Sequence, residues 1–272
     1  CTGPLAFKSW TPGQQISLVR NDNYWDPARK ARTKSATLSF TTDSNSLAQA
    51  LATGQYDGAY EVPAATIPTL TKTSSGSLVF GGPSQLYLAL ATTSTKGALA
   101  NADVRKALFM TIDRAAIAKA VYSGAAEANW TVLNQDSWRN ANTPTDAQKT
   151  WQSAYTGFQQ ERSTWGSTAA VTSAKDEASK GGYTGKPIVI ATLAGDATLS
   201  QVAQYIQAQA KQAGLNVQIK ELQAIDYSNA QVDPAARAGL DMILYVSFNA
   251  APNPLVQQRA GVALRLGRQR AI

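Results

Sequence analysis

The chain has 272 residues, 44% of them hydrophobic, and a formal net charge of +7 at pH 7. This length is typical of one large or two medium domains, and no apolar run approaches the roughly 18–20 residues that span a bilayer. The sequence contains no histidine and a single cysteine, Cys1, which excludes Ser-His-Asp and Cys-His catalysis, an intrachain disulfide and His/Cys zinc sites.

The first forty residues are typical of short strands joined by turns. Gln15–Arg20 alternates polar and apolar residues at period two, and Ala36–Phe40 is a second candidate strand. Three aromatic residues accompany these strands: Trp10, Tyr24 and Trp25. We expect them to pack at the edge of a sheet rather than to contact a ligand.

The next fifty residues mix helix and strand signals. A short helix is predicted over Ser46–Thr53 and ends at Gly54, a common helix-stop residue. The other elements predicted here are strands over Asp57–Val62, Ser77–Phe80 and Gln85–Thr92, with a short helix over Ala64–Leu70. We expect these strands to complete the first lobe of the protein.

A long amphipathic helix is predicted from Asn101 to Gly124. Asn101 or Asp103 offers a capping oxygen, and Gly124 follows the last turn. Apolar residues recur at steps of three and four and predict one buried face: Val104, Ala107, Leu108, Ile112, Ala115, Ile117, Ala120 and Val121.

A polar stretch of weak periodicity follows, and its tryptophans suggest that it is ordered: Trp130, Trp138, Trp151 and Trp165. Beyond it, alternating helix and strand patterns predict an α/β lobe. The predicted helices are Ala169–Lys180 and a helix with Val202, Ala203, Ile206, Ala210 and Ala213 on one face, and the predicted strands are Pro187–Leu193, Leu215–Leu222 and Leu240–Phe248.

Several runs resemble one known family. DVRKALFMTIDRAAIAKAVYSGAA is similar to a segment of the family 5 solute-binding proteins of ABC transporters, the peptide-, dipeptide- and nickel-binding group. CTGPLAFKSWTPGQQISLVRNDNYW resembles a second segment, and further similar motifs follow in the family's order up to about Leu255. The resemblance implies an α/β fold of the periplasmic-binding-protein-like type II, with two lobes built on mixed sheets.

The resemblance also divides the chain. It implies that residues 1–93 are part of lobe one, that 94–255 are part of lobe two, and that 256–272 are an atypical basic tail. Relative to the family, we expect truncation at both ends. The tail holds Arg259, Arg265, Arg268 and Arg270 and no acid; since the rest of the chain is nearly balanced in charge, nucleic acid is not an expected partner.

The function implied by the resemblance is capture of a peptide or similar small polar solute and its delivery to the membrane permease of an ABC importer. We expect an extracytoplasmic protein, in the periplasm or at the cell surface, with no cofactor and no enzymatic activity. For Cys1, both a lipid anchor and an incidental cysteine stay open. The candidate ligand-binding residues are aromatic walls and polar groups: Tyr60, Tyr87, Thr92, Trp130, Tyr245, Phe248 and Asn249.

One departure from the family bears on the ligand. Where the family motif has a tryptophan, this sequence has Ser247, and where the family has the aspartate that pairs with a peptide amino terminus, it has Ala250. Asp241 and Pro254 match the family motif. A neutral solute, such as an oligosaccharide or a blocked peptide, therefore fits the remaining groups better. The alternative is a degenerate or truncated remnant that acts as an interaction protein without its own ligand. Open sheet edges also predict self-association.

Overall fold

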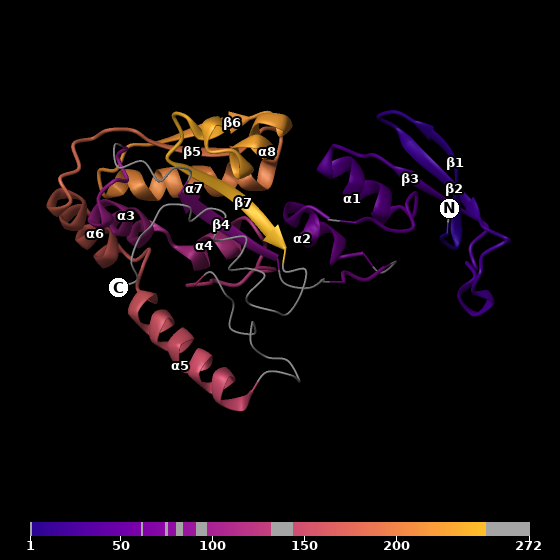
Figure 1. Ribbon diagram of the computed structural model, residues 1–272, viewed down its shortest axis with the longest axis horizontal. Coiled ribbons are helices and arrows are strands. Elements are labelled where there is room, and N and C mark those ends of the chain that lie inside the picture. The colour runs from indigo at the N-terminus through magenta and orange to yellow at the C-terminus, as the bar shows by residue number, and fades with distance from the viewer. Residues whose placement is uncertain are drawn as a thin grey trace. The chain divides into compact units, whose positions relative to one another are not determined.

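The computed structural model (Figure 1) describes residues 2–60, 62–73, 76–79, 84–90, 97–131 and 144–248, with the backbone alone in 84–90 and 247–248. The chain forms two compact units, Cys1–Leu78 and Val79–Ile272. Within the described ranges, no helix combines the length and apolar character needed to cross a membrane.

The first unit holds a three-stranded antiparallel sheet in the order β1-β2-β3. Its strands are β1 (Leu5–Thr11), β2 (Gln15–Arg20) and β3 (Ser35–Ser39), which confirms the two strands predicted from alternation. A tight turn with Gly13 at φ 72° joins β1 to β2, and a residue with a side chain rarely adopts that backbone conformation. The short helix η1 (Pro27–Arg29) follows β2.

The rest of the first unit is helical. Its helices are α1 (Ser44–Ala52), η2 (Ala64–Thr66) and α2 (Ile67–Leu70), as the sequence predicted. The Asp43 side chain caps α1 by accepting a hydrogen bond from the Ser46 amide at 2.7 Å. The predicted strands Asp57–Val62 and Ser77–Phe80 are wrong, because their described residues pair with no neighbouring strand and so form no ladder.

The second unit is built on a mixed sheet in the order β4-β7-β5-β6. The strands are β4 (Ser84–Leu90), β5 (Ile188–Leu193), β6 (Val217–Leu222) and β7 (Met242–Phe248). β5 runs parallel to β6 and β7, whereas β4 is antiparallel to β7. The strand expected over Gln85–Thr92 thus belongs to the sheet of the second unit. The lobe boundary expected at residue 93 stays a prediction.

The long helix predicted over Asn101–Gly124 is wrong in one respect, because it is interrupted. α3 (Ala102–Thr111) and α4 (Arg114–Ala120) are separated at Ile112, whose ψ of 107° is extended. Asp113 restarts the helix by accepting a hydrogen bond from the Ala116 amide at 2.8 Å. The apolar spacing survives the break at six of the eight predicted positions, whereas Ala115 and Ala120 are exposed. The residues that remain buried are Val104, Ala107, Leu108, Ile112, Ile117 and Val121.

The other helices described in the second unit are α5 (Thr145–Arg162), α6 (Thr168–Lys180), α7 (Ala197–Gln212) and α8 (Ala224–Val232), with the short 3-10 helix η3 (Ala235–Arg237). α6 and α7 confirm the predicted helices. α7 packs on β5 and β6, and α3 packs on both α6 and α7. α5 lies apart from the sheet (Figure 1) and buries Tyr155 alone among its residues.

Candidate functional site

The carboxyl ends of three strands define the candidate site. Because β5, β6 and β7 run in the same direction, Leu193, Leu222 and Phe248 end at one edge of the sheet. In open α/β sheets, ligands bind outside this carboxyl edge. β5 pairs with β7 through Ile190–Met242 and Ala191–Ile243, so the last residues of β7 extend past the end of β5.

Asp196 is a charged residue at this edge. The chain leaves β5, turns at Gly195 with φ 82° and enters α7. Asp196 caps α7, since its Oδ1 accepts a hydrogen bond from the Leu199 amide at 2.9 Å. The carboxylate is therefore held in place by the first turn of a sixteen-residue helix.

Three tyrosines accompany Asp196, and we call the four residues the tyrosine–aspartate cluster. Burial and, to a smaller extent, the Asp196 carboxylate raise the pKa of Tyr122 to about 12. Burial likewise raises the pKa of Tyr227 to about 12, with smaller contributions from Asp196 and Tyr245. Burial also raises the pKa of Tyr245. The phenols therefore stay neutral at physiological pH.

The cluster offers hydrogen bonding to an uncharged polar group. The Tyr227 hydroxyl is already committed, because it donates to the Leu244 carbonyl at 2.8 Å and lies in the core. Tyr122 and Tyr245 are half-buried at the border of the core. The charge of Asp196 acts on Tyr122 and on Tyr227, and Tyr245 is linked to the cluster through its effect on Tyr227. Among the described residues, no three His, Cys, Asp or Glu side chains gather closely enough to bind a metal.

The structure brings some of the predicted ligand residues together. Tyr87 and Tyr245 are Cα partners across β4 and β7, and Phe248 pairs with Ser84 at the carboxyl edge. Tyr60 lies in the first unit and is 88% exposed. Thr92 and Asn249 lie outside the described residues. None of these seven assignments is tested by the geometry alone, and they stay predictions.

Trp130 lies elsewhere in the second unit. Its ring centroid is 5.0 Å from the Arg114 guanidinium carbon at the first residue of α4. The neighbouring Asp113 amide donates to Gln209 near the end of α7, whereas Asp196 begins α7. Trp130 is thus at the opposite end of α4 from Tyr122, and it is not gathered with the tyrosine–aspartate cluster.

Asp241 has a structural role at the start of β7. Its Oδ2 accepts a hydrogen bond from the Val189 amide at 2.9 Å, and its own amide donates to the Val189 carbonyl at 2.9 Å. These bonds hold the entrance of β7 against β5. The retained aspartate therefore stabilises the sheet and lies away from the carboxyl edge. Ala250, at the place of the family's ligand aspartate, lies outside the described residues.

Sequence reasoning missed Asp196, Tyr122 and Tyr227. A signal for Asp196 was present, because a predicted strand ends just before Gly195-Asp196 and a helical pattern follows. A helix cap directly after a parallel strand places its side chain at the carboxyl edge. The two tyrosines carried no such signal, since their position depends on how α4 and α8 pack.

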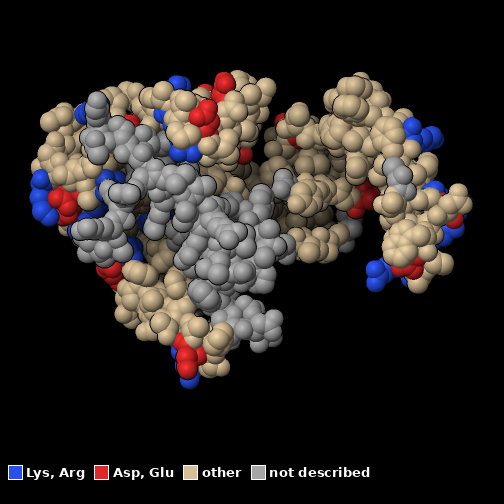
Figure 2. Space-filling view, viewed as in Figure 1, with Lys and Arg blue, Asp and Glu red and all other residues tan. Residues whose placement is uncertain are grey.

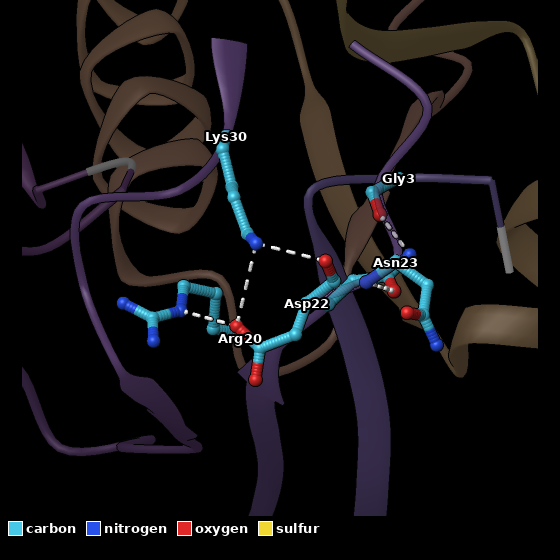
Figure 3. A network of polar contacts seen from close by, with 6 residues as sticks. Gly3, Arg20, Asp22, Asn23 and Lys30 are labelled. Atoms are coloured by element: carbon cyan, nitrogen blue, oxygen red, sulfur yellow. Dashed lines mark hydrogen bonds and ion pairs between the residues drawn. The ribbon is translucent and has the colours of Figure 1, made fainter. Parts of the chain in front are cut away.

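The loop after β2 forms a polar network that fixes the N-terminal segment (Figure 3). Arg20 donates to Asp22 at 2.9 Å, the Lys30 ammonium donates to the Asp22 carbonyl at 2.8 Å, and the Asn21 amide group donates to the Gly3 carbonyl at 3.0 Å. The Arg20 hydrogen bond is the main cause that lowers the pKa of Asp22.

The expected packing of Trp10 and Trp25 at the edge of the first sheet is wrong, since their side chains are 60% and 71% exposed.

Charged side chains do not gather into a field of one sign on the visible face. Figure 2 shows basic and acidic residues interspersed there. Several basic residues are paired with acids, including Lys106 with Glu177 at 3.1 Å and Lys180 with Asp103 at 3.8 Å. This distribution suits a polar surface better than a phosphate-backbone groove.

Comparison with known proteins identifies the relatives. Residues 1–258 match the model of the bacterial extracellular solute-binding proteins, family 5 Middle. The chain is 31% identical over 126 residues to the oligopeptide-binding protein OppA of Bacillus subtilis, covering 45% of this chain and 22% of that protein. It is 30% identical over 125 residues to the glutathione-binding protein GsiB of Pectobacterium atrosepticum, covering 46% and 24%.

Solved structures show the same fold. NikA from Brucella suis, in complex with Fe(III)-EDTA, superposes with a TM-score of 0.67 at 20% identity, covering 98% of this chain and 53% of that one. DppA from Helicobacter pylori, in complex with the peptide STSA, gives a TM-score of 0.67 at 19% identity, covering 95% and 45%. The chain thus spans about half of these structures, and its matched segments about a quarter of the curated relatives. The α/β, periplasmic-binding-protein-like fold expected from the sequence is confirmed.

Proposed function

The chain belongs to the bacterial extracellular solute-binding proteins of family 5, and we propose that it is the solute-binding component of an ABC importer. The observation that carries the proposal is the family match over residues 1–258. In this role the protein captures a small polar solute outside the cytoplasm and passes it to a membrane permease. A lipid anchor at Cys1 stays a prediction, since that residue lies outside the described range.

The proposed solute is peptide-like or oligosaccharide-like. The names of the relatives, oligopeptide-binding and glutathione-binding, support a peptide-like compound. The tyrosine–aspartate cluster supports a solute rich in hydrogen-bonding groups, because it holds neutral phenols and one carboxylate. In this proposal, residues 1–93 and 94–255 contribute to two lobes that enclose the solute, and Tyr60, Tyr87, Tyr245 and Phe248 supply its aromatic walls.

A thermal-shift panel tests the proposal. A ligand that binds the folded state adds RT ln(1 + [L]/Kd), about 2.7 kcal/mol at a hundredfold excess over Kd. The panel contains di- to hexapeptides and cello- and xylo-oligosaccharides, with glycerol at equal osmolality as the control. We expect one class to raise the unfolding midpoint. A flat response across the panel would favour the remnant without a ligand.

Self-association through open sheet edges stays a prediction, and we propose that an apolar sheet face of the first unit also takes part in it. The register places Phe7 opposite Leu18 and Trp10 opposite Ile16, so these side chains share one face of the sheet with Leu38, the partner of Ile16. On this face Phe7, Trp10 and Leu38 are 57%, 60% and 52% exposed. An uncovered apolar sheet face favours burial against a second copy.

Light scattering coupled to size exclusion tests this association. We expect a concentration-dependent dimer that Trp10→Asp shifts to monomer. The matched control is Ile225→Asp, which places the same charge on an apolar residue that is 76% exposed on α8. A monodisperse monomer at all concentrations would contradict the proposal.

A further inference from the structure

Two arginines share one tryptophan ring at the amino-terminal end of α4. The guanidinium carbon of Arg114 is 5.6 Å from the centroid of the Trp165 ring, and that of Arg162 is 5.4 Å from it. Trp130 lies on Arg114 at 5.0 Å, and Phe158 lies near Arg162 at 4.9 Å. We call these five residues the arginine–aromatic stack. Such contacts hold a guanidinium in a fixed orientation.

Backbone contacts fix the stack independently of its side chains. The Trp165 amide donates to the Arg162 carbonyl at 3.0 Å, and the next amide, of Gly166, donates to the Met110 carbonyl at 2.8 Å. Gly166 has φ 89° and packs against the backbone of Asp113, the residue before Arg114. The end of α5 and the start of α4 are therefore joined, and the positions of the two guanidiniums are set before any ligand binds.

The charges of the stack are poorly compensated in the described part of the chain. Arg114 donates to the Ile112 carbonyl at 3.1 Å and faces no carboxylate among the described residues. Arg162 has only its neighbour Glu161, at 3.6 Å, whose side chain is 63% exposed. A guanidinium carries five N–H donors, so most donors of this pair have no protein acceptor there.

This arrangement disfavours the charged form of Arg114. Burial, and to a smaller extent the positive charge of Arg162, lower the pKa of Arg114 from 12.5 to about 10. By contrast, Lys106 and Lys180 both reach Glu177. Two like charges thus lie beside one ring, and the exposed Glu161 near Arg162 is the one acid paired with them among the described residues, so we expect an anion that contacts both guanidiniums to stabilise them.

We propose that Arg114 and Arg162 form a binding site for a doubly charged oxyanion of the phosphate class, either free phosphate or a phosphate monoester. Two guanidinium groups match a dianion in charge, and their planar forks donate pairs of hydrogen bonds to phosphate oxygens. Both guanidinium carbons lie within 5.6 Å of the Trp165 ring centroid. The site is at the other end of α4 from Tyr122, so it is separate from the tyrosine–aspartate cluster and does not depend on the proposed function.

Isothermal titration with inorganic phosphate and with glycerol phosphate, at constant ionic strength, tests the site in the full chain. We expect one anion per chain and at least a tenfold weaker affinity in Arg114→Gln and in Arg162→Gln. Arg162→Lys keeps the charge but loses the fork, so it should lie between wild type and Arg162→Gln. The matched control is Arg32→Gln, which removes the same charge from an exposed residue of the first unit and should bind as wild type does.

The two anions identify the source of the ligand. Equal affinity for both indicates a site that reads the phosphate group alone, and tighter binding of glycerol phosphate indicates a monoester ligand. Circular dichroism shows whether Arg114→Gln folds, and Arg162→Gln tests the site if it does not. No heat with wild type, or equal loss of binding in Arg32→Gln, would overturn the proposal.

Discussion

Gly166→Ala should destabilise the second unit by about 2–5 kcal/mol. A methyl group at this position would meet the Asp113 backbone at 2.3 Å from Cα and 2.6 Å from the nitrogen, and φ is 89°. The left-handed backbone costs a residue with a Cβ about 1–2 kcal/mol. Forcing an extra carbon against packed atoms adds about 1–3 kcal/mol. Urea unfolding followed by circular dichroism measures the sum.

A matched control separates the two contributions. Gly182 has φ 71° and nothing within 4 Å of an added Cβ. Gly182→Ala therefore carries the backbone cost alone, and we expect a loss of about 1–2 kcal/mol. If Gly166→Ala were no more destabilising than Gly182→Ala, the close packing of this turn on Asp113 would be refuted.

Three further changes test other contacts. Asp43→Ala removes the hydrogen bond to the Ser46 amide and should lower the urea unfolding midpoint, whereas Asp43→Asn should change it little because asparagine also caps. Lys106 lowers the pKa of Glu177 below 4.5, so this carboxylate stabilises the folded state above pH 4.5. The difference in unfolding midpoint between wild type and Glu177→Gln should therefore shrink as the pH falls below 4.5. A difference that stays constant with pH would contradict the ion pairs of Glu177. Folding raises the pKa of Tyr227 from 10.0 to about 12, so its stabilisation is present below pH 10 and lost as pH rises toward 12. Tyr227→Phe should cost about 1 kcal/mol at neutral pH and nothing near pH 12, and a cost that persists there would contradict the shift.

Periodicity predicted the α/β core of the second unit well. α6, α7, β5, β6 and β7 all lie close to the ranges expected, because each buries a regular apolar pattern against its neighbours. The apolar periodicity did not predict the break at Ile112. The apolar steps continue across it, while a single extended residue and the Asp113 cap redirect the chain. Capping by an internal aspartate competes locally with helix continuation, and periodicity does not register it.

Helices with little burial were harder to predict. α5 buries only Tyr155 among its residues, so its polar sequence showed no stripe to detect. In the first unit, alternation near Asp57 and Ser77 predicted strands that have no partner in the described residues. A strand forms only where a neighbour pairs with it, and sequence alternation does not supply that neighbour.

The candidate site was predictable in part. The strand ends were expected, and with them Tyr87 and Tyr245, which are register partners. The position of Trp130 was not expected from the sequence, because its contact with Arg114 depends on how the residues after α4 fold back to the first turn of that helix. Tyr122 and Tyr227 meet Asp196 through packing of α4 and α8, which no spacing along the chain encodes.

The central claim is that a polar solute binds at the carboxyl edge of the second sheet. Isothermal titration of the full chain with a tripeptide and with a cello-oligosaccharide tests it, comparing wild type with Tyr245→Leu and with the control Tyr205→Leu on the outer face of α7. We predict one solute per chain for one of these probes, a tenfold or greater loss in Tyr245→Leu, and no change in Tyr205→Leu. Absence of binding to both probes, or equal affinity of wild type and Tyr245→Leu, would contradict the claim.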